Sequence, residues 1–250
     1  SMTNAQRTDY ASAAIVGKPI NGLWSYKYAG LNEEGRAQFY NEKGEKVLKG
    51  MNNIEGLVYS GTTMPLVQGG FTNTFMYKNV TLSVLLVGNF GNVIRLRNMT
   101  DGQAFAYPAA TQNMSKEWAS RWRKPGDENY TNIPALNTVA GAHSNPWWSS
   151  GTNMTHQIAS NVYEMYDNSD IRVVSGNYLR LSSLSFRYNV DDRFCKKLGL
   201  KSAYINLTGT NLFTIAHKKL RGQDPTQSGS SPSVNLSVRP TYSCNLSITF

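Results

Sequence analysis

The stretch 242–250 alternates strictly between two kinds of side chain. Every second residue is large or apolar, and the residues between them are Ser, Asn or Thr: the apolar set is Tyr242, Cys244, Leu246, Ile248 and Phe250. Successive side chains of a β-strand point to opposite faces, so the stretch predicts a strand with one apolar and one polar face. Such a strand needs an apolar neighbour on one side only, either a second protein layer or lipid.

The same period of two recurs upstream. A hairpin is predicted over 70–90 with its turn near Lys78-Asn79, because Phe71, Phe75 and Tyr77 share one parity before the turn and Leu82, Val84 and Leu86 share one after it. The other predicted elements are a strand over 21–31, a polar hairpin over 32–48, a loop over 55–70, strands over 176–190 and 201–213, and a short helical turn over 191–200.

The connections between these strands differ strongly in length. The links at 78–79 and 191–200 are short and fall at one end, whereas the segments 93–175 and 214–238 are long and fall at the other. Short turns at one end, long loops at the other and strands of about ten residues are typical of outer-membrane β-barrels. We therefore predict an all-β chain that forms part of a transmembrane antiparallel β-barrel, with 93–175 as a long extracellular loop region.

About half of the sequence resembles the C-terminal part of the SusC/RagA-type TonB-dependent outer-membrane transporters of the Bacteroidetes. The motifs that carry the resemblance are Ser-Gly-Thr-Thr-Met-Pro (60–65), Gly-Gly-Phe-Thr-Asn-Thr-Phe (69–75) and Gly-Thr-Asn-Leu-Phe-Thr (209–214). They lie within the longer similar stretches 26–45, 60–95, 177–190, 207–214 and 221–225, and the terminal Phe250 fits as well.

The resemblance implies a 22-stranded barrel in the cell outer membrane, with a plug domain inside it. It also implies a SusD-like surface lipoprotein as a lid, and TonB acting through an N-terminal segment. Residues 1–250 would then be the C-terminal barrel section of an importer of oligosaccharides or peptides, without the plug domain. About six strands cannot close so large a barrel, so we expect the chain to be part of a longer protein. In this family a final strand ending in Phe is the barrel-insertion signal, which assigns that role to Tyr242, Leu246, Ile248 and Phe250.

Four tryptophans lie in the predicted extracellular segment: Trp118, Trp122, Trp147 and Trp148. Their rings would stack on sugar rings or on apolar peptide side chains at the barrel mouth. The alternative is that they pack within a folded loop or against the lid protein. Four tyrosines near strand ends are expected to form the aromatic belt at the membrane interface, with ordinary packing in the strands as the alternative: Tyr77, Tyr178, Tyr188 and Tyr242.

Other function classes find little support. No hydrolase, protease or calcium-loop motif occurs, so we expect no enzyme, no metal and no cofactor. The net charge of +9 is compatible with a solvated basic surface that has no partner. The chain has no zinc-finger spacing and no basic helix, so an anionic membrane surface is a better candidate partner than nucleic acid. Cys195 is expected to be a small buried residue, and Cys244 to lie on the apolar face. Two further alternatives are a soluble β-sandwich carbohydrate-binding module and a β-rich adhesin.

Overall fold

A computed structural model describes residues 17, 19–48, 56–99, 115–136, 162–226 and 238–250. These residues form two compact units. One contains residues 65–92, 175–226 and the C-terminal strand, and we call it the sheet unit. The other contains the described residues up to Met64 and those between Val93 and Val174, and we call it the loop unit.

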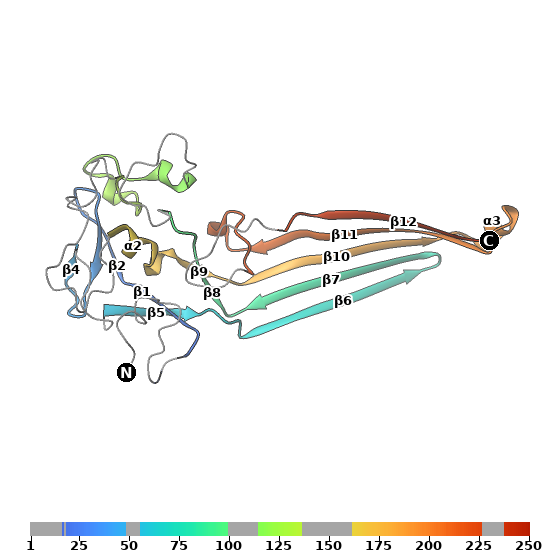
Figure 1. Cartoon of the computed structure of the whole chain (residues 1–250), viewed down its shortest axis with the longest axis horizontal. Coiled ribbons are helices and arrows are strands. Elements are labelled where there is room, and N and C mark those ends of the chain that lie inside the picture. Colours follow the sequence, from blue (N-terminus) through green and yellow to red (C-terminus); the bar gives the residue numbers. More distant parts are fainter. Residues whose placement is uncertain (1–16, 18, 49–55, 100–114, 137–161, 227–237) are drawn as a thin grey trace. The chain divides into compact units, whose positions relative to one another are not determined.

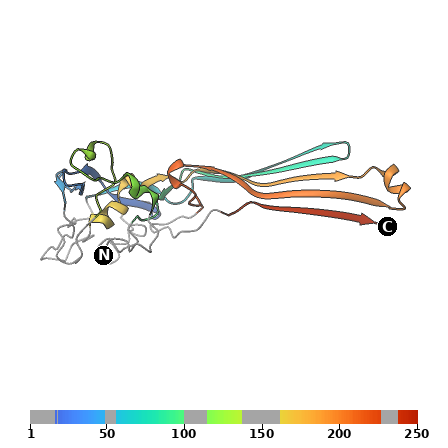
Figure 2. The ribbon, with the colours of Figure 1, turned by 90° about the horizontal axis from the view of Figure 1, so that it is seen from above.

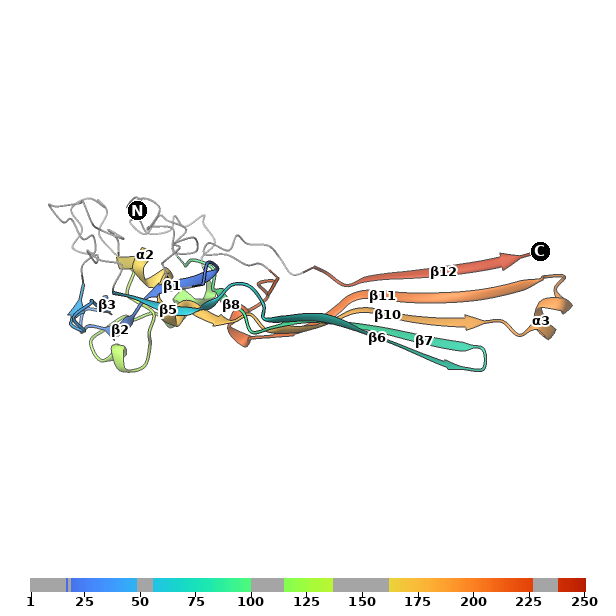
Figure 3. The same cartoon turned by 90° about the horizontal axis from the view of Figure 1, so that it is seen from below.

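The sheet unit is one antiparallel sheet of five long strands in the order β12-β11-β10-β7-β6, which lie side by side in Figures 1 and 3. Their bounds are β6 (Val67–Tyr77), β7 (Val80–Phe90), β10 (Tyr178–Asn189), β11 (Ser202–Ala216) and β12 (Thr241–Thr249). Aromatic and β-branched residues, which favour strands, are frequent in β6, β7, β11 and β12, whereas β10 has three aromatic residues and no β-branched one. The predicted hairpin over 70–90 is confirmed, although it begins three residues earlier, at Val67.

The connections of the sheet unit are as uneven as predicted. Lys78 and Asn79 join β6 to β7, and a link containing helix α3 (Asp192–Lys197) joins β10 to β11. Both links lie at the end of the sheet that also holds Phe250, which Figure 2 shows from above. We call this end the short-turn end. The chain from β7 to β10 and the chain from β11 to β12, which includes η7 (Lys218–Leu220), leave from the opposite end.

Strand β10 contains an irregularity that keeps its apolar residues on one face. Leu181 pairs with Leu86 of β7, but the next pair is Ser183 with Leu85, so Ser182 has no partner in that register. The sequence alternation also slips here, since Leu181 is at an odd position and Leu184 at an even one. The unpaired Ser182 forms a β-bulge, which compensates for the change from odd to even positions. Leu181 and Leu184 therefore lie on the same face of the sheet.

The loop unit is built from short strands and single helical turns. Its strands are β1 (Gly22–Tyr26) paired with β5 (Leu57–Thr62), the three-stranded sheet β2 (Tyr28–Leu31), β3 (Ala37–Tyr40) and β4 (Lys46–Val47), and the pair β8 (Val93–Arg95) and β9 (Val173–Ser175). Its helical turns are η2 (Lys116–Ser120), η3 (Asp127–Asn129), α2 (Val162–Asp167) and η6 (Asp170–Arg172). The predicted polar hairpin over 32–48 corresponds to β3 and β4 with their turn at 41–45.

Two sequence expectations are wrong in this unit. The single strand predicted over 21–31 is two strands, and all five residues of β1 are buried, so β1 has no wet face. It belongs to a protein core and not to the five-stranded sheet. The segment 55–70 was predicted as a loop, but β5 and the start of β6 lie within it. Glycine is favoured at position 61 of this strand for two reasons. The backbone there adopts φ +125°, which other residues rarely adopt, and a Cβ would lie 2.8 Å from a Val93 methyl group.

A hydrophobic core holds the loop unit together. Its buried members come from strands, from helical turns and from Met99, which follows β8: Trp24, Tyr26, Leu31, Ala37, Phe39, Leu57, Met99, Trp118, Met165 and Tyr166. Aromatic rings meet edge to face within it, for example Tyr26 with Phe39 at 5.9 Å between centroids. Edge-to-face contacts add to the stabilisation that comes from apolar burial.

Candidate functional site

The five-stranded sheet separates its side chains by polarity, and its two faces are the candidate functional site. Residues that pair across strands share a face, so the register defines rows that run across the sheet. On the apolar face the rows are Tyr77–Val80–Tyr188–Ile205–Leu246, Phe75–Leu82–Phe186–Leu207–Cys244, Asn73–Val84–Leu184–Gly209–Tyr242, Phe71–Leu86–Leu181–Phe213 and Gly69–Gly88–Leu179–Ile215. Asn73 is the single polar side chain in these rows.

Charged residues are almost absent from the five strands. Only Arg180 and Arg187 are charged, and both lie on the opposite face, where Arg180 pairs with Thr214 and Arg187 with Asn206. A charge on the outer face of a barrel costs about 2–4 kcal/mol at the middle of a bilayer. The distribution of charge is therefore the one that contact with hydrocarbon requires.

No second protein layer covers the apolar face among the described residues. Its large side chains are exposed or half-buried; Phe71 is 60% exposed, Phe75 57% and Leu246 63%. A sandwich core would bury such residues almost completely. The face extends along β7 for about 34 Å, at about 3.4 Å per residue. A tilt of about 40° reduces this to about 26 Å, close to the apolar band of membrane barrels.

The tyrosines predicted for the aromatic belt do not all share a position. Tyr77 and Tyr188 lie on the apolar face at the short-turn end, on either side of Val80. Tyr242 lies on the same face but in the central row, opposite Gly209. The expectation for Tyr178 is wrong: it pairs with Asn89 on the polar face and is buried, with the Arg180 guanidinium 5.4 Å from its ring.

The opposite face, which we call the polar face, carries mostly small hydrogen-bonding side chains, with Met76, Leu85 and Val87 as apolar exceptions. One row across all five strands carries only hydroxyl groups: Thr74, Ser83, Ser185, Thr208 and Ser243. Thr74 and Ser83 are 3.1 Å apart at their hydroxyl oxygens. The Ser185 hydroxyl donates to Asn206 Oδ1 at 2.9 Å, and Asn206 Nδ2 donates to Thr208 Oγ1 at 3.1 Å. The face offers donors and acceptors to water or to a polar partner.

One ion pair ties a connection to the polar face. Arg180 Nη2 donates to Asp224 Oδ1 at 2.9 Å, and Arg180 Nε donates to Thr214 Oγ1 at 3.0 Å. The same oxygen of Asp224 accepts from both the amide and the hydroxyl of Thr226. Burial alone would raise the pKa of Asp224, but the bonds from Thr226 and the charge of Arg180 outweigh it and lower that pKa. No sequence motif reveals this pair, since Arg180 and Asp224 are 44 residues apart.

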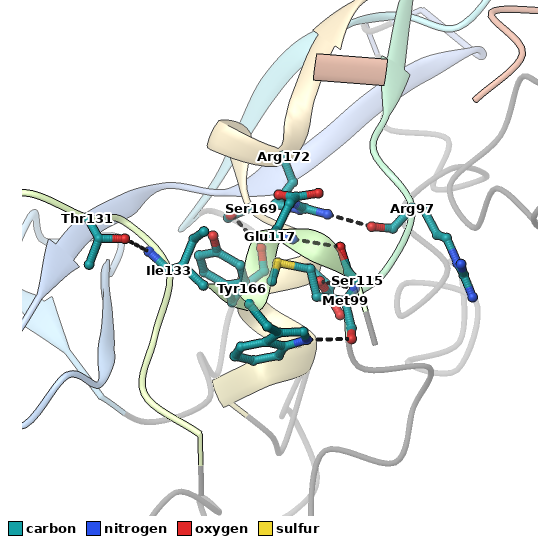
Figure 4. A network of polar contacts seen from close by, with 11 residues as sticks. Arg97, Met99, Ser115, Glu117, Thr131, Ile133, Tyr166, Ser169 and Arg172 are labelled. Atoms are coloured by element: carbon teal, nitrogen blue, oxygen red, sulfur yellow. Dashed lines mark hydrogen bonds and ion pairs between the residues drawn. The ribbon is translucent and has the colours of Figure 1, made fainter. Parts of the chain in front are cut away.

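In the loop unit, a second ion pair organises the chain around helix α2. Arg172 Nη1 donates to Glu117 at 2.7 Å, and Arg172 Nη2 donates to the backbone carbonyl of Arg97 (Figure 4). The Arg172 guanidinium also lies 5.9 Å from the Tyr166 ring centroid. Burial raises the pKa of Tyr166 above its usual range, and the nearby Arg172 charge only partly offsets this. Both tyrosine and arginine are structural here.

The tryptophans predicted to bind substrate occupy different surroundings. Trp118 is 6% exposed in the core, and its indole N–H donates to the Met99 carbonyl at 3.1 Å. Trp122 is half-buried, its ring lies against Gly35, and its N–H donates to Glu128 at 3.0 Å. These positions favour the alternative, packing within a folded loop. Trp147 and Trp148 lie outside the described residues, so substrate binding by the four remains a prediction.

Among the described residues, no group of three or more His, Cys, Asp or Glu side chains is arranged to hold a metal ion. Within the same residues, no helix is both long and apolar enough to span a membrane. Cys195 is buried and Cys244 is exposed on the apolar face, as the sequence predicted.

No family model matches the chain. A protein of Formosa agariphila named TonB-dependent receptor P26 is 26% identical over 182 residues, which is 71% of this chain and 15% of the receptor. The chain is similar to a section of a TonB-dependent receptor. The resemblance to TonB-dependent transporters, stated from the sequence motifs, is thereby confirmed.

The fold of the chain is similar to that of solved structures of a peptide importer. The RagAB peptide importer in its open-open state matches 94% of this chain with a TM-score of 0.66 and 16% identity. The closed-closed state matches 92% with a TM-score of 0.62 and 18% identity. In both cases the chain covers 23% of the matched chain. The prediction of an all-β section of an antiparallel barrel is confirmed at the level of the fold.

Proposed function

We propose that this chain is the C-terminal barrel-wall and mouth section of a TonB-dependent importer in the cell outer membrane. One observation carries the proposal: a five-stranded sheet with an uncharged apolar face that no described residue covers, and a mostly hydrogen-bonding face on the other side. In a bilayer the first face would contact hydrocarbon and the second the wet interior. The similarity to a TonB-dependent receptor supports the same proposal.

The edges of the sheet support a larger barrel. Among the described residues, β6 and β12 each have a neighbouring strand on one side only. Unpaired backbone groups are costly in lipid, so sheets span a bilayer as closed barrels. The chain spans 15% of the curated receptor and 23% of the RagAB chain. We infer that further strands of the same protein pair with both edges, and that a plug domain fills the interior.

We assign the loop unit to the mouth of the barrel, because its segments connect strands at the end with the long links. The segment 93–175 would then be extracellular. A SusD-like lipoprotein would close the mouth, and TonB would act through a segment outside this chain. Trp122 is the described tryptophan better suited to substrate contact, since it is only partly buried. The terminal residues Tyr242, Leu246, Ile248 and Phe250 remain proposed as the insertion signal.

The substrate class proposed is oligosaccharide or peptide. Fluorescent oligosaccharides and peptides of matched size can be offered to cells with and without the complete importer, and the class whose uptake falls on deletion is the substrate. If the protein is a TonB-dependent importer, uptake should also be lost when TonB is removed. Unchanged uptake of both classes in the deletion strain would contradict import of either.

The membrane location is tested separately by extraction. The complete protein should sediment with the outer membrane, resist alkaline carbonate and require detergent for solubilisation. Release by carbonate as a soluble monomer would favour the β-sandwich alternative and would contradict the barrel-wall assignment.

A further inference from the structure

We propose that the short-turn end of the sheet binds the headgroups of anionic phospholipids in the adjacent membrane leaflet. The inference rests on the proposed function, because it takes the apolar face as the surface in contact with hydrocarbon. It concerns the turn at 78–79, the link 190–201 with helix α3, and the side chains beside them.

Helix α3 and the residue that follows it present two large apolar side chains that nothing covers within the described part of the chain. Phe194 is 58% exposed and Leu198 is 61% exposed. They are four residues apart, a spacing that places side chains on one side of a helical turn. Cys195 between them is 1% exposed, so α3 is seated on the rest of the sheet unit by its opposite side. Two exposed apolar groups at the end of an apolar sheet face indicate contact with the membrane interface.

Hydrogen bonds within the link define the backbone conformation of α3. The Asp191 side chain accepts from the Arg193 amide at 2.8 Å and caps the helix N-terminus. The Leu200 amide donates to the Cys195 carbonyl at 2.9 Å and closes the link after the helix. Phe194 and Leu198 are therefore held outward by backbone structure, and their exposure is a property of the fold.

Several cationic side chains lie at the same end of the sheet unit as these two residues, and we call them the cationic cluster. The exposed cations of the short-turn end are Lys78, Arg193, Lys196, Lys197 and Lys201, against the two carboxylates Asp191 and Asp192. Within the described residues, none of these cations has a carboxylate oxygen within 4.0 Å. Basic side chains beside exposed apolar ones are the combination that binds anionic membrane surfaces.

This cationic cluster continues directly from the apolar face. Tyr77 and Tyr188 end the apolar rows at this end, and the Lys78 ammonium lies 5.4 Å from the Tyr77 ring centroid. Aromatic rings at the interface and lysines beyond them match the depth at which lipid phosphates lie. The charge also favours an anionic lipid over a neutral sugar, because a sugar would accept hydrogen bonds from the lysines without neutralising their charge.

The test uses the complete importer, purified in a neutral detergent and titrated with dioleoylphosphatidylglycerol or dioleoylphosphatidylcholine. Native mass spectrometry counts the lipids retained. A lysine near an anionic surface contributes about a fivefold increase in affinity. The triple variant Lys196→Gln/Lys197→Gln/Lys201→Gln should therefore bind phosphatidylglycerol about a hundredfold more weakly, with little change for phosphatidylcholine.

The matched control removes the same charge elsewhere: Lys43→Gln/Lys116→Gln/Lys124→Gln, three exposed lysines of the loop unit. It should bind phosphatidylglycerol like the unaltered protein. Equal affinities of all three proteins, or equal losses in both variants, would overturn the inference. The proposed function is judged independently by carbonate extraction, so a protein that assembles in the membrane but ignores the substitutions refutes this inference alone.

A second measurement does not depend on the lysine variant folding. In vesicles containing lipids brominated near the headgroup, the change Phe194→Trp should add fluorescence that the bromine quenches. Tyr130→Trp serves as the control, since Tyr130 is 91% exposed in the loop unit. Its added fluorescence should be unquenched. Equal quenching at both positions, or none at residue 194, would contradict contact between α3 and the membrane.

Discussion

Placing an arginine at Leu184 tests the assignment of the two faces most directly. Leu184 lies in the central strand and in the central row of the apolar face, between Val84 and Gly209. If that row is at the bilayer midplane, Leu184→Arg should lower the free energy of unfolding by about 2–4 kcal/mol. This corresponds to a roughly 30- to 1,000-fold smaller folding equilibrium constant.

Two neighbouring positions provide matched controls. Ser185→Arg places the same side chain on the polar face, where the expected loss is about 1 kcal/mol for the hydrogen bond from Ser185 to Asn206. Tyr188→Arg places it on the apolar face but at the short-turn end, where a charge reaches the interface and costs at most about 1 kcal/mol. The order of destabilisation should therefore be Leu184→Arg first, with the two others close together.

The assay is guanidinium unfolding of the complete importer in lipid vesicles, followed by tryptophan fluorescence. Heat-dependent mobility in SDS gels verifies that each variant starts from an assembled barrel. A loss at Ser185→Arg equal to that at Leu184→Arg would refute the assignment of faces. Equal losses at Leu184 and Tyr188 would refute the depth assigned to the rows.

Three further predictions follow from local geometry. Gly35→Ala should destabilise the loop unit by about 2–3 kcal/mol, because residue 35 has φ +74° and a Cβ would lie 2.4 Å from a Trp122 ring atom; Gly44→Ala, at φ +79° with open space, should cost about 1 kcal/mol by the same melting measurement. Because the pKa of Asp224 is lowered in the folded protein, the ionised carboxylate stabilises the fold above the ordinary carboxyl pKa, and this stabilisation is lost as pH falls below about 4. Hydrogen exchange at the Thr226 amide, which donates to Asp224, should therefore accelerate in acid. The variant Asp224→Asn should abolish that pH dependence. A charged thiol reagent should label Ser243→Cys in the membrane-embedded protein and leave Cys244 unlabelled, because only the first thiol faces water; labelling of both would contradict opposite faces.

The sheet unit could be predicted from sequence because its strands obey a simple rule. One face of each strand contacts an apolar environment and the other contacts water, so apolar residues recur at every second position. The stretches around Leu82 and Leu246 show this alternation clearly. The register across strands could not be obtained, because it depends on bulges such as the one at Ser182. The misplacement of Tyr178 shows the limit: its position near a strand end was correct, but its face was not.

The loop unit was far less predictable, for a physical reason. Its core joins β-strands, helical turns and isolated segments, so no single period describes its apolar residues. Trp118 and Trp122 have the aromatic character of a ligand platform, yet one is a core residue and the other rests on Gly35. The ion pair between Arg172 and Glu117 joins residues 55 apart in sequence, with no local pattern to mark it.

The unpaired Ser182 in β10 has a consequence for how the barrel is assembled correctly. If Ser182 were taken into the ladder, every later residue of the strand would change sides. Three apolar side chains would then move from hydrocarbon to water, namely those of Leu184, Phe186 and Tyr188. Each transfer would cost about 2 kcal/mol of free energy, and Arg187 would enter hydrocarbon. A strand paired in the wrong register is thus destabilised on both faces of the sheet. The alternating sequence therefore favours the correct register during insertion.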